Sequence, residues 1–160
     1  MTAQAFIPMK DGQVKSQEST IFTPDMKVAF RKKIVEIAMS QLEKPYIWGA
    51  KASLSDPNPN AFDCSGLTAW CFIRAGLKMP EGSSNQFDYC KQVDVPTIGD
   101  LGFFRNQKGI YHVGIYTGKE MIEARGLQSD GIGGKVILRP VTNWVNYKAF
   151  CGFRSQPNLV

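Results

Sequence analysis

The chain has 160 residues, about the length of one domain, with 43% apolar and 21% charged residues. This composition excludes intrinsic disorder over most of the chain, and no apolar run approaches the ~18 residues of a membrane span. The net charge of +5 is compatible with an anionic polymer or surface, but it is too small to indicate nucleic acid. We therefore expect one globular domain that neither binds nucleic acid nor inserts into a membrane.

The first 22 residues are polar and carry no regular apolar period. We expect them to form an N-terminal arm, followed by a single domain at residues 23–160. Residues 1–17 lack the basic start and the long apolar stretch of a secretory signal. We therefore expect a protein that is made in the cytoplasm without a signal peptide.

Helices are expected in the first half of the domain. Thr23-Pro24 is a helix-start signal, in which an N-cap residue is followed by proline at the first helical position. This helix is expected to run to about Glu43, with the basic run 31–33 largely on its solvated surface. Two more helices are expected, one from about 65 to 75, closed by Gly76, and a short one from 83 or 84.

Strands are expected from residue 99 onward, where short apolar runs alternate with turn residues. These runs cover residues 99–104, 112–117, 120–125, 135–141 and 148–154. Because the helices come first and the strands second, the order indicates an α+β fold in which helices pack on an antiparallel sheet.

Cys64 lies where a loop turns into the second helix. The free N–H groups and the helix dipole at such a point favour a thiolate, and the same N–H groups can hold an oxyanion. The small neighbours Ser65 and Gly66 would let a substrate carbonyl approach closely. The alternative is that Cys64 is a small buried apolar residue.

A thiol nucleophile needs a base, and His112 is the one histidine of the chain. It begins a predicted strand, and Gly114 leaves space beside it because residues two apart share a face of a strand. A lone histidine with four cysteines that form no CxxC pair offers no set of metal ligands. We therefore expect neither a metal nor an organic cofactor.

Glu123 lies on the strand that follows His112 and is a candidate to orient the imidazole. A two-residue turn at 118–119 makes Glu123 a diagonal neighbour of His112, and a turn at 117–118 places the two directly opposite. Both registers put the two side chains on one face. In the first register Arg125 would sit opposite His112 and compete for the carboxylate.

Five motifs occur in order along the chain: residues 44–49 (KPYIWG), 63–67 (DCSGL), 83–86 (SSNQ), 99–101 (GDL) and 112–116 (HVGIY). This succession resembles the NlpC-type (NlpC/p-sixty) cell-wall cysteine peptidases over about residues 28–155. The resemblance implies a papain-like α+β fold, with N-terminal helices packed against a five- to six-stranded antiparallel sheet and the nucleophile at a helix N-terminus. It also implies hydrolysis of bacterial peptidoglycan stem peptides, typically between γ-D-glutamate and the following diamino acid, without a cofactor.

The resemblance assigns roles to individual residues. Cys64 matches the nucleophile, His112 the base, and Tyr46 the tyrosine whose hydroxyl lies beside the nucleophile. The third catalytic position commonly holds His, Asn or Gln in relatives, and here it is Glu123. A second departure is Glu81, where a basic residue often precedes the serine-rich turn.

Three further residues are expected to bind the substrate or its oxyanion. Asp63 and Ser65 match residues that flank the nucleophile and contact the stem peptide, and Gln86 belongs to the third motif. With Tyr46 they complete the expected binding set.

The run from Ile122 to Gly126 is similar to phage-tail relatives of this family. Together with the expected lack of a secretory signal, it predicts action in the cell wall or periplasm after delivery by a phage tail, as a virion-associated lysin, or by a secretion apparatus. Two alternatives are an amidase or acyltransferase on the same fold, and a catalytically silent tail or hub component. The intact pair of Cys64 and His112 argues against the silent alternative.

Overall fold

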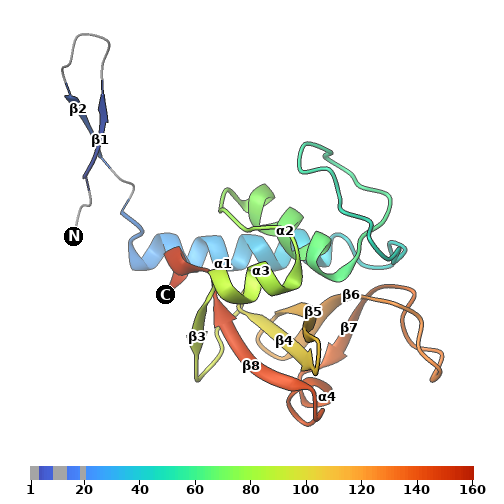
Figure 1. Cartoon of the computed structure of the whole chain (residues 1–160). Coiled ribbons are helices and arrows are strands. Elements are labelled where there is room, and N and C mark those ends of the chain that lie inside the picture. Colours follow the sequence, from blue (N-terminus) through green and yellow to red (C-terminus); the bar gives the residue numbers. More distant parts are fainter. Residues whose placement is uncertain (1–3, 9–13, 19–20) are drawn as a thin grey trace.

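The structure is a computed structural model that describes residues 4–8, 14–18 and 21–160. Its elements are β1 (Gln4–Pro8), β2 (Val14–Glu18), α1 (Pro24–Met39), α2 (Cys64–Ala75), α3 (Ser83–Tyr89), β3 (Lys91–Val93), β4 (Leu101–Asn106), β5 (Gly109–Tyr116), β6 (Glu120–Arg125), β7 (Lys135–Pro140), α4 (Thr142–Val145), β8 (Phe150–Ser155) and the 3-10 turn η1 (Pro157–Leu159). Helices α1, α2 and α3 lie over one face of the sheet and α4 lies near its opposite side (Figure 1). The predicted α+β architecture is confirmed.

The sheet has six strands in the order β3-β8-β4-β5-β6-β7, and every pair is antiparallel. All five predicted strands are present, the one at 120–125 with the predicted bounds and the other four with shifted ends, whereas β3 and α4 were not predicted. Strand β3 has three residues and α4 has four, lengths at which apolar periodicity gives no signal. Among the described residues, no helix combines the length and the apolar character that crossing a membrane requires.

Helix α1 begins as the sequence predicts, because the hydroxyl of Thr23 accepts a hydrogen bond from the N–H of Met26 at 3.2 Å and Pro24 is the first helical residue. It ends at Met39, four residues before the predicted end. The N–H of Glu43 donates to the carbonyl of Val136 in β7 at 3.0 Å. This pairing with a strand draws the chain out of the helix, and no local signal announces it.

The expectation that Arg31 lies on a solvated surface is wrong. Its side chain is buried, and its guanidinium donates to Asp100 Oδ1 at 2.7 Å and to Ser155 Oγ at 2.8 Å. It also donates to the carbonyls of Ile98 and Leu159, both at 2.9 Å. Arg31 therefore ties α1 to the start of β4 and to the C-terminal segment.

Helix α2 carries the centre of the core. Leu67, Cys71 and Phe72 are fully buried in it, so Cys71 packs there as a small buried apolar residue. Gly76 ends the helix in the left-handed conformation, with φ of 98°, as predicted. The helix packs against β5 and β6, and its first residue is Cys64.

The predicted N-terminal arm contains a hairpin that its sequence did not suggest. Strands β1 and β2 pair antiparallel, with Gln4 opposite Glu18 and Pro8 opposite Val14. Residues 1–3, 9–13 and 19–20 lie outside the described residues, so the division into a 22-residue arm and a domain at 23–160 stays a prediction.

Candidate active site

Cys64 is the first residue of α2 and is half-buried. Asp63 is the N-cap, and its Oδ1 accepts the N–H of Gly66 at 2.7 Å. This bond occupies the third helical N–H and leaves those of Cys64 and Ser65 as the unused donors of the turn. The two N–H groups are therefore available as donors to an oxyanion.

Gly66 has a packing role that the sequence did not suggest. A Cβ there would lie 2.7 Å from Asp63 Oδ1 and 2.9 Å from the carbonyl oxygen of Ala50. The glycine is therefore required by packing inside the loop and cap, and its expected part in the approach of a substrate stays a prediction.

His112 and Glu123 meet as the strand pattern predicts. Ile115 pairs with Ile122 across β5 and β6, which is the register of the turn at 118–119. His112 Nε2 lies 3.1 Å from Glu123 Oε1. Because an ionised carboxylate only accepts hydrogen bonds, Nε2 carries the proton and Nδ1 is left to face the nucleophile. Arg125 does not compete for Glu123, since its ion-pair partner is Asp130.

The sulfur of Cys64 lies beside this imidazole. Its Sγ is 4.0 Å from the carbonyl oxygen of Tyr111, the residue before His112. Burial by itself would lower the pKa of His112, but hydrogen bonds and charges from Cys64 and Glu123 outweigh it and raise the pKa to about 9. The arrangement therefore stabilises an imidazolium next to the thiol at neutral pH.

Two residues that the sequence did not single out complete the surroundings of Glu123. Arg139 of β7 donates from Nε to Oε2 at 3.0 Å and from Nη2 to Oε1 at 2.9 Å, and Trp144 Nε1 donates to Oε2 at 2.7 Å. Glu123 is fully buried. Burial would raise its pKa, but the hydrogen bonds and positive charges of His112 and Arg139 outweigh burial and lower it.

The space that Gly114 leaves beside His112 is filled by the indole of Trp144. A Cβ at position 114 would lie 2.8 Å from Trp144 Cη2. The indole and the imidazole are stacked, with ring centroids 5.4 Å apart. The glycine thus lets Trp144 both orient the imidazole by contact and reach Glu123. A tryptophan near the end of the chain gives no sequence signal for this role.

The three other cysteines lack the setting of Cys64. Burial raises the pKa of the Cys71 thiol far above its usual range, and that of Cys90 to about 12. Burial also raises the pKa of Cys151. Among the four, Cys64 alone combines a place at a helix start with a neighbouring imidazole.

Tyr46 enters the site through backbone pairing. It bridges to Phe62, and its N–H donates to the carbonyl of Gly134 at 2.9 Å. Partial burial, followed by the charges of Cys64 and Asp63, raises the pKa of Tyr46. The hydroxyl therefore stays protonated and can donate to a thiolate or an oxyanion.

Gln86 is brought near this site but not into contact with solvent. It is fully buried, and its amide donates to the carbonyls of Ser65 and Pro80, both at 2.9 Å. Thr68 donates to its oxygen at 2.7 Å. Gln86 therefore braces the first turn of α2, which corrects the expected contact with substrate.

The remaining predicted residues lie at the edge of the site. Ser65 is half-buried in the first turn of α2, and its contact with substrate stays a prediction, as does that of Asp63. Glu81 pairs with Lys51 at 3.6 Å on the exposed surface. No group of three or more potential metal-ligating side chains occurs in the described ranges.

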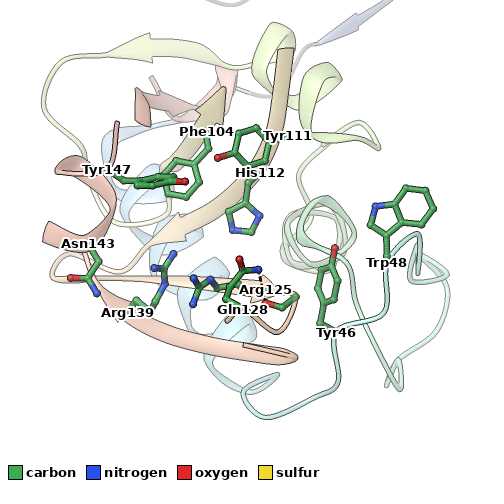
Figure 2. Close-up of a pocket in the computed structure, with 11 residues that line it drawn as sticks. Tyr46, Trp48, Phe104, Tyr111, His112, Arg125, Gln128, Arg139, Asn143 and Tyr147 are labelled. Atoms are coloured by element: carbon green, nitrogen blue, oxygen red, sulfur yellow. Dashed lines mark hydrogen bonds between the residues drawn. The ribbon is translucent and has the colours of Figure 1, made fainter. Parts of the chain in front are cut away.

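A cleft of about 570 Å³ opens beside His112. Figure 2 shows Tyr46 and Trp48 on one side of the imidazole and the rings of Phe104 and Tyr147 on the other. Arg125, the last residue of β6, and Gln128 of the following loop also line the cleft. Arg139 and Asn143 reach it from β7 and α4 (Figure 2). The cleft therefore presents the imidazole and a wall of aromatic and cationic side chains.

A thiol at a helix N-terminus facing an imidazole on an antiparallel sheet defines the class of papain-like cysteine hydrolase folds. Residues 43–155 match the model of the NlpC/P60 family, and the chain belongs to that family. The papain-like fold expected from the sequence is thereby confirmed.

Two curated relatives illustrate the similarity. The chain is 39% identical over 102 residues to the "probable endopeptidase p60" of Listeria grayi, covering 61% of this chain and 19% of the relative. It is 34% identical over 110 residues to the "bifunctional muramidase/DL-endopeptidase CwlT" of Bacillus subtilis, covering 66% of this chain and 32% of the relative. The match thus spans about a fifth to a third of the length of these relatives.

Two solved structures share the fold. The peptidoglycan hydrolase RipB of Mycobacterium tuberculosis superposes with a TM-score of 0.67 at 30% identity, over 83% of this chain and 67% of that one. RipD of the same organism, described as a non-catalytic NlpC/p60 domain protein adapted to peptidoglycan binding, gives 0.62 at 24% identity, over 80% and 97%. At that lower identity the second likeness concerns the fold alone.

Proposed function

We propose that the chain is a peptidoglycan endopeptidase that cleaves stem peptides at the γ-D-glutamyl–diamino acid bond, with Cys64 as nucleophile and His112 as base. The observation that carries the proposal is the Cys64 thiol at a helix start beside an imidazole whose other nitrogen is held by buried Glu123. Relatives named as endopeptidases and a structural neighbour named as a peptidoglycan hydrolase support it.

The proposed reaction is acyl transfer through a thioester. The Cys64 thiolate attacks the carbonyl carbon of the scissile amide, and the N–H groups of Cys64 and Ser65, with the Tyr46 hydroxyl, stabilise the oxyanion. The His112 imidazolium gives its proton to the amide nitrogen, and the C–N bond breaks to release an amine. Neutral His112 then takes a proton from water, the hydroxide oxygen attacks the thioester, and the C–S bond breaks to restore the thiolate.

Digestion of purified sacculi, followed by mass analysis of the fragments, tests the proposal. Fragments with a new amino terminus on the diamino acid are expected. Release of intact stem peptides from the glycan would instead indicate an amidase. Transfer of the acyl group to an acceptor other than water would indicate an acyltransferase. Binding to sacculi without any cleavage would favour the silent alternative, the property that its description gives RipD.

Labelling with iodoacetamide at neutral pH tests the nucleophile separately. Cys64 is expected to react well before the other thiols, because burial raises the pKa of Cys71, Cys90 and Cys151. Peptide mapping measures the order of labelling. Modification of Cys151 with Cys64 untouched would remove the assignment.

We also propose that the domain reaches the wall or periplasm as part of a delivered assembly, at a phage tail or through a secretion apparatus. The resemblance of residues 122–126 to phage-tail relatives of this family motivates this proposal. Mass spectrometry of purified particles tests it, and the protein's presence in the virion at a fixed copy number is the expected result.

A further inference from the structure

The charged side chains that line the cleft beside His112 are cationic. Within the described residues, its lining includes two arginines, Arg125 and Arg139, and no aspartate or glutamate. Tyr147, Asn143 and Gln128 add neutral hydrogen-bonding groups. The imidazolium of His112 adds a positive charge at neutral pH, because the pKa of His112 is raised to about 9. A ligand of this cleft is therefore expected to carry negative charge.

The two arginines differ in how far their charges are neutralised. Arg139 makes a bidentate pair with buried Glu123, at 3.0 and 2.9 Å. Arg125 lies 3.8 Å from Asp130, whose side chain is 52% exposed to solvent, and it donates to the carbonyl of Ile132 at 3.2 Å. A guanidinium has five N–H donors, so most of those of Arg125 remain for a ligand.

Arg125 is also fixed in place. It ends β6 two residues after Glu123, and side chains two apart share a face of a strand. Its own carbonyl accepts the N–H of Gly134, at 2.6 Å, and Gly126 packs on the Tyr46 ring. In Figure 2 its side chain lies between Arg139 and Tyr46, below His112. A preformed guanidinium near the reacting groups is suited to hold a planar anion.

We propose that Arg125 binds a carboxylate of the stem peptide and thereby selects the substrate. The inference rests on the proposed function, which supplies the peptide. A γ-linked glutamate keeps a free α-carboxylate on one side of the scissile bond. A diamino acid with two carboxyl groups, such as diaminopimelate, presents a second carboxylate on the other side, whereas lysine does not. Either group would meet the same guanidinium chemistry.

Four synthetic peptides, alanyl-γ-D-glutamyl-X-alanine with a C-terminal carboxamide, distinguish the two sources. X is diaminopimelate or lysine, and the glutamate α-group is a carboxylate or a carboxamide. Binding to the Cys64→Ala protein is measured by calorimetry, with and without Arg125→Gln, so that no cleavage occurs. Arg125→Gln is expected to weaken binding about 10- to 100-fold for peptides that carry the recognised carboxylate, and not for those that lack it.

Arg105→Gln is the matched control. Arg105 is exposed on β4 and stacks over the Phe87 ring, outside the cleft lining, so all four affinities should be unchanged. Arg125→Lys keeps the charge without the planar fork, and an intermediate loss is expected. Equal affinities for all four peptides would overturn the inference. So would a loss of affinity in Arg125→Gln that is the same whether or not a peptide carries either carboxylate.

Hydrolysis of the same peptides by the unsubstituted protein separates the two proposals. If none is cleaved, the proposed function fails. Arg125-dependent binding to the Cys64→Ala protein would then still support carboxylate recognition.

Discussion

The domain contains two buried arginine–carboxylate pairs that use the same chemistry to different ends. Arg31 and Asp100 join α1 to the sheet at 2.7 Å, and Arg139 and Glu123 join β7 to β6 at 2.9 Å. The carboxylates are 1% and 0% exposed. Burying an ion pair is costly unless further hydrogen bonds satisfy it, and both pairs have them.

The difference lies in the remaining partners. Asp100 also accepts from the Ser155 hydroxyl and from the N–H of Thr97 at 2.7 Å, neither of which titrates near neutral pH. Glu123 also accepts from His112, which does. The first pair is closed within the protein, and the second continues through the imidazole to the Cys64 thiol. A buried ion pair therefore indicates a functional site when its network ends on a titratable group in a cleft.

The largest effect is expected at Cys64 and His112, where the network of Glu123 and Arg139 reaches the cleft. Cys64→Ala and His112→Ala should each lower hydrolysis of a defined muropeptide by about 10⁴-fold or more, with the double variant no worse than either single, because the two act as one unit. Steady-state rates measure this, and circular dichroism checks the fold. Appreciable activity in Cys64→Ala would place the nucleophile elsewhere.

Removing the arginine from each pair sharpens the comparison. Arg31→Met leaves Asp100 without a cation, so a loss of about 3–5 kcal/mol in the free energy of unfolding is expected. Arg139→Met leaves Glu123 with the imidazolium of His112, so a smaller loss is expected. Only Arg139→Met should change the pH–rate profile. Losing its positive charge favours the imidazolium of His112, so the alkaline limb should move to higher pH.

Urea unfolding and pH–rate profiles of the two variants measure these effects. An Arg31→Met protein whose alkaline limb moves as far as that of Arg139→Met would mean that the two networks do not differ in function.

Glu123→Gln should lower the rate by about 10- to 100-fold, because the amide keeps an acceptor for the ring but loses the charge. The pKa of His112 is raised to about 9, and this raised pKa stabilises the folded state. The contribution is fully present below pH ~6.5 and is lost as the pH rises from there through about 9. In Glu123→Gln this contribution should shrink, and the alkaline limb should move to lower pH, opposite to Arg139→Met.

We compare hydrolysis rates and the pH dependence of unfolding for Glu123→Gln and Glu123→Ala. The glutamine variant tests the charge alone, and the alanine variant also removes the contact with the ring. The alanine variant should be slower still. Coincident profiles for both variants and the unsubstituted protein would make Glu123 a bystander.

The smallest effect is expected from shortening the chain at its N-terminal end. Removing residues 1–20 should leave sacculus digestion by the domain unchanged, because α1 begins at Pro24 with its own cap. Dye release from labelled sacculi measures this. Incorporation into a particle, compared with and without these residues, tests a docking role, and equal incorporation would refute it.

Local features of the sequence determined much of the fold and the reactive pair. Thr23 caps α1, Gly76 closes α2, and Cys64 starts a helix, because such signals depend on a few neighbouring residues. The parity of two adjacent strands was enough to place Glu123 on the face of His112.

The tertiary structure alone decided which long polar side chains are buried and what they meet. Arg31 is satisfied by a carboxylate 69 residues away, and Glu123 by Arg139 and Trp144, at separations of 16 and 21 residues. Gln86 likewise turned inward to brace α2 rather than to meet substrate. An isolated stretch of sequence carries no record of such partners, because a buried polar group is stable only where the fold delivers a complementary donor or acceptor.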